Sequence, residues 1–201
     1  MLSMKKLSEC GVKIIGGQIM TRVTANTEKG DEVIETRKVL VPKCIHSDGT
    51  ITAEDMPEET LKVSADPKKL TQTGDIVMKL STPYDAGLVT AETEGAIVPS
   101  FCAILKSDNS VNQDYLLAFL NSSACKDQLR MQVSGAVMTV LSVGKIGNVD
   151  VPVPPENEQH AIGGRFVETA NKLAILQKIA ALEAKRNDIV FKEMIKNYAE
   201  C

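Results

Sequence analysis

The stretch VPVPPENEQHAI, residues Val151–Ile162, divides the sequence into two parts of different character. Its prolines bias the residues before them away from the α region, so we expect the first half of the stretch to be extended. From Glu156 to position 200 there is no proline, and only Gly163 and Gly164 interrupt the run. Apolar residues then recur every three or four positions, which predicts a long amphipathic helix.

The predicted helix is too long for the rest of the chain to cover. At about 1.5 Å per residue it would extend for roughly 50–60 Å if unbroken. We therefore expect part of its apolar stripe to pack on another helix, most simply that of a second copy of the chain. Glu183, Arg186 and Asn187 interrupt the stripe, so it is not a strict heptad repeat. The residues predicted to form the dimer contact are Leu173, Leu176, Ile179, Leu182, Ile189 and Val190.

The same stripe leaves two alternatives open. It can belong to two shorter helices folded back on the body, in which case its apolar residues are intrachain core. A glycine costs about 1 kcal/mol within a helix. Gly163 and Gly164 therefore mark either a kink or a close approach to the body.

The residues before the helix carry mixed strand and helix signals. The predicted fold class is α+β, with a mixed α/β body over 1–153 and a helical tail over 154–201. Short apolar runs between turn residues predict strands. These runs lie at 12–15, 33–35, 39–41, 76–80, 87–89 and 96–98.

Three further segments of the body have a recognisable pattern. Apolar residues alternate over 100–105, from Phe101 to Leu105, which predicts a half-buried strand with Phe101 facing inward. Helical spacing of apolar residues predicts a helix over 112–132. The acidic stretch 52–66 is typical of a solvated loop with a helical turn.

Composition excludes several classes of protein. The chain has 201 residues, of which 43% are apolar and 24% charged, as in globular rather than disordered proteins. Five cysteines without a C-x-x-C pair argue against a disulfide framework and favour the cytoplasm. No apolar run is long enough to cross a membrane. Cys44 and His46 are too few ligands for a zinc site, so we expect no metal.

The sequence also lacks the motifs of common enzymes. It contains no P-loop, no nucleophile elbow, no H-E-x-x-H motif and no G-x-G-x-x-G loop. Its two histidines provide little general-base capacity at neutral pH. We therefore expect no catalytic residues, and a binding module rather than an enzyme.

Five segments, taken in order, carry a family resemblance. They are Lys43–Ile51 (KCIHSDGTI), Leu70–Val77 (LTQTGDIV), Tyr115–Ser122 (YLLAFLNS), Gly135 with Leu141–Ile146 (LSVGKI), and the opening stretch Val151–Ile162. Their order and spacing resemble the specificity (S) subunit of type I restriction–modification systems. The last of them is similar to the I-P-L-P-P-x-x-E-Q-x-x-I junction that opens the conserved spacer helix of that family.

The resemblance implies a function without chemistry of its own. The body would be a target recognition domain for double-stranded DNA, and the tail would be the spacer helix. Members of the family usually carry two of each, so this chain resembles a half-subunit. Two copies would pair their helices antiparallel, as a coiled-coil-like homodimer on a bipartite, inverted-repeat target. The protein would bind no cofactor and would recruit methyltransferase (M) and restriction (R) subunits.

Candidate DNA contacts come from two parts of the body. The net charge is −3, yet residues 1–45 carry eight basic and five acidic residues. Within that segment we expect Arg22, Arg37, Lys38 and Lys43 to contact phosphates or bases. A second patch, where the family resemblance places a DNA-facing loop, consists of Lys79, Ser81 and Thr82.

Alternatives remain for these residues and for the protein. Each candidate can instead be an ordinary solvated side chain. The acidic balance, and the stretch 52–66 in particular, leaves open a protein that has lost DNA binding and acts as an interaction or regulatory partner. A small enzyme without recognisable motifs is a third possibility.

Overall fold

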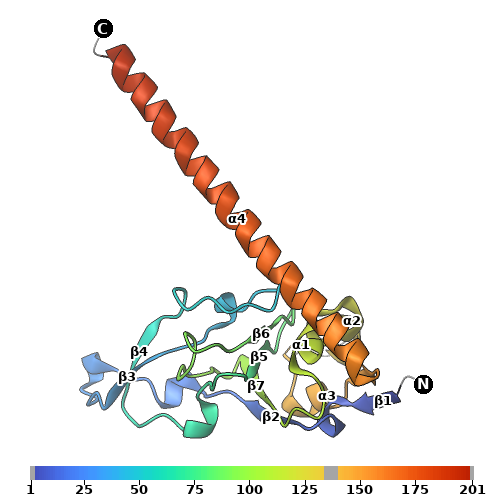
Figure 1. Cartoon of the computed structure of the whole chain (residues 1–201). Helices are drawn as coiled ribbons and strands as arrows, with labels where there is room; N and C mark the ends of the chain where they lie inside the picture. Colours follow the sequence, from blue (N-terminus) through green and yellow to red (C-terminus); the bar gives the residue numbers. More distant parts are fainter. Residues whose placement is uncertain (1–2, 134–139, 200–201) are drawn as a thin grey trace.

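One long helix projects from a body of short strands and helices. The computed structural model describes residues 3–133 and 140–199 (Figure 1). The helix, α4, runs without a break from Glu156 to Ala199. The predicted α+β class with a long C-terminal helix is therefore confirmed, and the alternative of two shorter helices is wrong. Among the described residues, no helix has both the length and the apolar composition of a membrane span.

Three antiparallel sheets organise the described part of the body. The central sheet has four strands in the order β2-β7-β5-β6. Two-stranded ladders join β1 to β8 and β3 to β4. The strands are β1 (Ser3–Lys6), β2 (Val12–Gly16), β3 (Glu35–Lys38), β4 (Glu58–Leu61), β5 (Ile76–Lys79), β6 (Ala86–Leu88), β7 (Cys102–Ser107) and β8 (Asp150–Val153). The shorter helices are α1 (Gln113–Asn121), α2 (Ser123–Val133) and α3 (Val143–Gly147).

The central strands are buried on both faces. On β5, Ile76 and Met78 join the core that also contains residues of α1 and α2, whereas Val77 joins a second core on the opposite face. β7 alternates in the same way, with Leu105 in the first core and Ile104 in the second. The expected half-buried strand over 100–105 is therefore wrong, because segments before β5 and between β6 and β7 cover the face that alternation left for solvent.

Several other expectations differ from the structure. The acidic stretch 52–66 contains strand β4, which pairs with β3. The single helix expected over 112–132 is two helices, since Ser122 is extended (ψ 153°) and its hydroxyl accepts a hydrogen bond from the backbone N–H of Cys125. The predicted strands at 39–41 and 96–98 take part only in isolated bridges, and the run 33–35 overlaps β3 only at Glu35.

A joint between α1 and the first turns of α4 sets the direction of the long helix. Gln159 is only 5% exposed, and its amide bonds two segments. Its Oε1 accepts from the backbone N–H of Asn112 at 2.8 Å, and its Nε2 donates to the carbonyl of Pro154 at 2.8 Å. The hydroxyl of Tyr115, on α1, donates to the carbonyl of Pro152. The stretch that opens the tail is thus fastened to α1 on both sides of Glu156.

The glycine pair resolves into one close approach and one open position. A Cβ on Gly163 would lie 2.6 Å from the backbone nitrogen of Tyr115, whereas a Cβ on Gly164 would meet nothing within 4 Å. Only the first glycine lets α4 approach α1 closely. Since α4 is one continuous helix, the pair marks a close approach.

This difference supplies a matched pair of substitutions. Either Gly→Ala change should gain about 1 kcal/mol of helix propensity. Gly163→Ala must also push α1 away, and overpacking of this kind typically costs about 1–3 kcal/mol. We expect Gly164→Ala to raise the melting temperature measured by circular dichroism and Gly163→Ala to lower it. Equal stabilisation by both would contradict the close approach.

Candidate nucleic-acid interface

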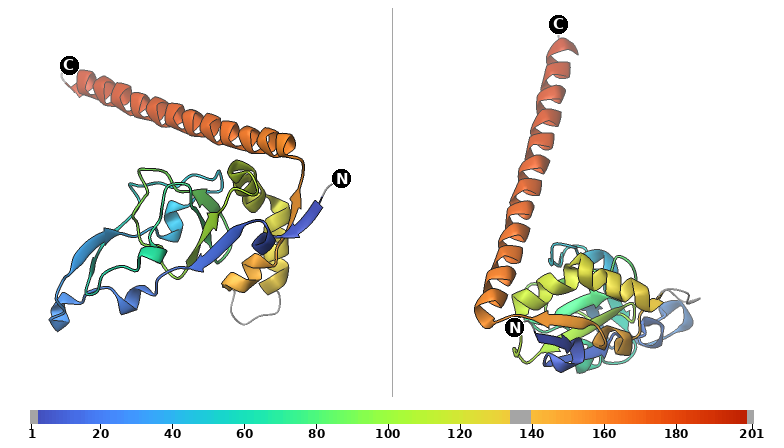
Figure 2. Two further views of the ribbon diagram at one scale, coloured as in Figure 1. Left: turned by 60° about the horizontal axis from the view of Figure 1, so that its bottom comes forward. Right: turned by 90° about the vertical axis from the view of Figure 1, so that its right-hand side faces the viewer.

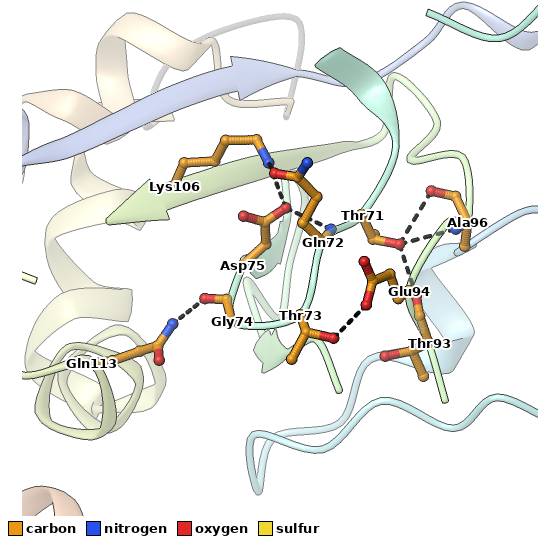
Figure 3. A network of polar contacts seen from close by, with 10 residues as sticks. All are labelled: Thr71, Gln72, Thr73, Gly74, Asp75, Thr93, Glu94, Ala96, Lys106 and Gln113. Carbon is orange, nitrogen blue, oxygen red and sulfur yellow. Dashed lines mark hydrogen bonds and ion pairs between the residues drawn. The ribbon is translucent and has the colours of Figure 1, made fainter. Parts of the chain in front are cut away.

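The Leu70–Val77 segment forms a turn held by a network of polar contacts (Figure 3). The carboxylate of Asp75 accepts from the backbone N–H of Gln72 at 2.8 Å and forms a 2.7 Å ion pair with Lys106 on β7. Gly74 has φ +92°, a conformation that favours glycine, and its carbonyl accepts from the amide of Gln113 on α1. The turn therefore ties β5 to β7 and to α1.

Thr71 connects the same turn to the segment that contains Thr93 and Ala96. The hydroxyl of Thr71 donates to the carbonyl of Thr93 at 2.7 Å and accepts from the backbone N–H of Ala96 at 3.0 Å (Figure 3). Both Thr71 and Asp75 are buried. These motif residues hold the body together, so contacts to a ligand must come from the loops that they position.

The lysine at the end of β5 is not a free cation. Lys79 lies 2.9 Å from Asp85, whose other oxygen lies 2.7 Å from Lys126. The side chain of Asp85 is 6% exposed and each lysine side chain 13%. Burial alone would raise the pKa of Asp85, but hydrogen bonds from Lys126 and Lys79 and their charges outweigh it and lower that pKa. Lys79 can reach a phosphate only by leaving this ion pair.

Lys43 lies close to this cluster and is more accessible. It is exposed on a 3-10 turn over Pro42–Cys44. Together with Lys79, Asp85 and Gln177 of α4, it lines a cleft of about 700 Å³ between the body and α4. Among the described residues, no carboxylate lies within ion-pair distance of Lys43.

The remaining basic candidates lie farther from the α1–α4 joint. β3 and β4 occupy the opposite end of the body (Figures 1 and 2). On β3, the side chain of Arg37 bonds to Glu35 at 3.0 Å, so its charge is partly neutralised. Lys38 is exposed and lies across the ladder from Glu58. Arg22 is exposed at the end of a 3-10 turn over Met20–Arg22.

Ser81 and Thr82 lie at one end of the central sheet, next to an aromatic residue that the sequence pattern placed in the core. The backbone N–H of Leu80 donates to the carbonyl of Phe101 at 2.9 Å. Phe101 is 61% exposed, because β7 begins only at Cys102. Pro99 lies two positions before Phe101, and a proline at this point of the sequence indicates a turn. This signal would have placed Phe101 in the turn rather than in the strand.

The predicted dimer residues all lie on the free part of α4. Ala170 is the last buried residue of the helix, and every residue over 171–196 is exposed. Only the first turns lie against the body, and the rest extends away from it (Figure 2). The six apolar side chains predicted for the contact are each 45–58% exposed. The structure therefore places the predicted residues in five regions: the cleft, the turn Met20–Arg22, the β3–β4 ladder, the end of the sheet and α4.

Asp85→Asn tests the shared carboxylate. The substitution leaves two nearly buried lysines without their counter-charge, so we expect it to lower the free energy of unfolding by about 3 kcal/mol at pH 7. Because the folded protein lowers the pKa of Asp85, this contribution exists above the ordinary aspartate pKa of about 3.9 and disappears as pH falls through the lowered value. Urea unfolding at pH 7 and under more acidic conditions measures both effects.

Asp127→Asn provides the control for this experiment. Asp127 also pairs with a cation, Arg130, but its side chain is 63% exposed, so we expect little change in stability. Equal behaviour of the two variants at pH 7 would argue against a structural role for the Asp85 cluster.

Comparison with known proteins gives a result only at the level of structure. The sequence matches no protein-family model and no curated protein. The HsdS subunit from Thermoanaerobacter tengcongensis matches with a TM-score of 0.62 and 16% identity, over 94% of this chain and 47% of that one. A structure from work on complex assembly and conformational transition of the type I R-M system matches with a TM-score of 0.60 and 18% identity, over 92% and 42%.

A third solved structure extends the same result. The type I restriction-modification S subunit from M. genitalium matches with a TM-score of 0.52 and 12% identity, over 92% of this chain and 44% of that one. The chain thus spans about half the length of the structures it matches, and the match includes both the body and α4. The chain has the fold of a type I restriction–modification specificity subunit.

Proposed function

We propose that the protein is a sequence-specific DNA-binding subunit of a type I restriction–modification complex. The observation that carries this proposal is the match of body and helix together, over 94% of the chain, to an HsdS subunit. In this role the body recognises one half of a bipartite target in double-stranded DNA. The protein binds no cofactor and carries out no reaction, and it recruits the methyltransferase and restriction subunits.

The exposed part of α4 supports a homodimer. Its apolar side chains have no cover within the described residues, and an exposed apolar stripe of this length favours a partner helix. The 4-3 spacing from Ile175 through Ile179 and Leu182 also places Arg186 and Glu193 on the same seam. In a parallel pair in register, each of these charges would face its own copy. An antiparallel pair avoids both repulsions.

An antiparallel pair also has the geometry for a divided target. α4 has 44 residues, which corresponds to a length of about 66 Å. A turn of B-DNA is about 34 Å long, so the helix pair would span nearly two turns. The two bodies would then lie at opposite ends of the pair and would recognise inverted half-sites.

A salt titration separates DNA recognition from the alternative, an interaction or regulatory protein that does not bind DNA. The candidates that lack ion-pair partners among the described residues are Arg22, Lys38 and Lys43. Replacing all three with glutamine should lower the slope of log affinity against log salt by up to about 2.7 per chain, because each phosphate contact contributes about 0.9. Fluorescence anisotropy with a labelled random duplex between 50 and 200 mM salt measures the slope.

Lys5, Lys13 and Arg130 provide a control with the same change in charge. All three are exposed on other elements, so their replacement with glutamine should leave the slope nearly unchanged. A wild-type protein that shows no binding, even with a methyltransferase subunit present, would favour the regulatory alternative.

Light scattering tests the homodimer. We expect the wild type to have the mass of two chains at micromolar concentration. Leu182→Glu places a charge in the middle of the stripe and should yield a monomer with unchanged helical content. Ala184→Glu adds the same charge on another face of α4 and should remain a dimer. A monomeric wild type at tens of micromolar would refute the dimer.

A further inference from the structure

Phe101 is an aromatic residue on the surface whose backbone is held in place by hydrogen bonds. The chain has four phenylalanines and no tryptophan, and this one is 61% exposed. Its backbone is held on both sides, because its carbonyl accepts from the N–H of Leu80 at 2.9 Å and the N–H of Cys102 donates to the carbonyl of Pro99 at 2.9 Å. The position of the ring at the surface is therefore a consequence of a well-bonded turn.

Three chain segments meet around this turn. They are 17–22, 80–83 and 99–102. The backbone N–H of Gln18 donates to the carbonyl of Val98, and the N–H of Ser100 donates to the carbonyl of Gln18, both at 2.7 Å. A Cβ on Gly17 would lie 2.1 Å from the carbonyl oxygen of Pro99, so only glycine permits this crossing. The second glycine of the Gly16–Gly17 pair thus fixes the two segments against each other.

The charge of this region favours a polyanion. The chain contains 26 acidic residues, but none of them lies in the three segments. Arg22 is exposed at the end of the first segment, and the ammonium group of Lys69 lies 3.1 Å from the carbonyl oxygen of Gly17. Asp85, which follows the second segment, is already paired with two lysines. Within the three segments, a phosphate group would therefore meet basic and hydroxyl side chains but no carboxylate.

We infer that Phe101 contacts the methyl group of a thymine in the recognised half-site, beside the hydroxyl groups of Ser81 and Thr82. This inference rests on the proposed function. Phenylalanine is one of the side chains that make apolar contact with the thymine methyl in the major groove. A protein partner would need a contiguous apolar core. Within the three segments, the only other large exposed apolar side chain is Ile19.

A double-mutant cycle tests the contact: the wild type and Phe101→Ala are each measured on a duplex with thymine and on one with uracil at the same position. The wild type is first used to select its preferred sequence from random duplexes, and each thymine of the selected half-site is then replaced by uracil, which lacks only the methyl group. Loss of one buried methyl corresponds to about a fourfold loss of affinity. We expect this loss at one thymine for the wild type and no loss there for Phe101→Ala. Phe101→Leu should retain part of the discrimination.

Met131→Ala serves as the control, because Met131 is also exposed and apolar but lies on α2. It should discriminate thymine from uracil as the wild type does. Circular dichroism verifies that each variant is folded.

The remaining outcomes distinguish this inference from the proposed function. If the wild type binds no duplex, even with a methyltransferase subunit present, the proposed function is wrong and the inference fails with it. If the wild type binds but is insensitive to uracil, or its selected half-site has no thymine, only the inference fails. The inference also fails if Phe101→Ala keeps the discrimination, or keeps DNA binding while losing association with a methyltransferase subunit, which would indicate a protein contact.

Discussion

The amide of Gln159 is the contact on which the arrangement of body and helix depends. It bonds the backbone of Asn112 at the start of α1 and the backbone of Pro154 just before α4. A buried amide with both ends satisfied is a directional constraint, because any rotation of α4 would leave a donor or an acceptor unpaired. Over a helix of about 66 Å, a tilt of about 10° at this joint would move the far end by roughly 10 Å. The spacing of two paired bodies would therefore be set within a few residues of this amide.

The periodicity of the sequence was sufficient to predict the long helix. It was not sufficient to predict which faces of the body's strands are covered or which charged side chains pair. The 3.6-residue repeat and the prolines before Glu156 predicted where α4 begins. Alternation over 100–105 was ambiguous, because a strand buried on both faces and a half-buried strand differ only in what covers them. Phe101 was assigned to the core for this reason. Lys79 was taken as a DNA contact, since nothing local in the sequence reveals that it shares Asp85 with Lys126.

The net charge of −3 is a poor guide to what the surface can bind. Several acidic residues are used in ion pairs and hydrogen bonds within the protein. Asp75 pairs with Lys106, and Glu35 accepts a 2.6 Å hydrogen bond from the backbone N–H of Ala65. That bond, together with Arg37, outweighs desolvation and holds the pKa of Glu35 below its ordinary value. Formal charge counts these internal carboxylates equally with exposed ones, whereas a ligand responds to the local arrangement of charges.

Most candidate contacts lie outside the resemblance motifs, and Lys43, the first residue of the Lys43–Ile51 segment, is the exception. Thr71, Asp75 and Gln159 are buried and fully bonded, and the side-chain amide of Asn121 on α1 forms two hydrogen bonds with the backbone of Ala86 on β6. Such residues fix the sheet, α1 and α4 relative to one another. Of the exposed basic candidates, Arg22 and Lys43 lie in turns attached to that frame, and Lys38 lies on β3. Under the proposed function, substitutions at these positions would alter what is recognised without changing the joint, so the spacing between two half-sites and the sequence within each would vary independently.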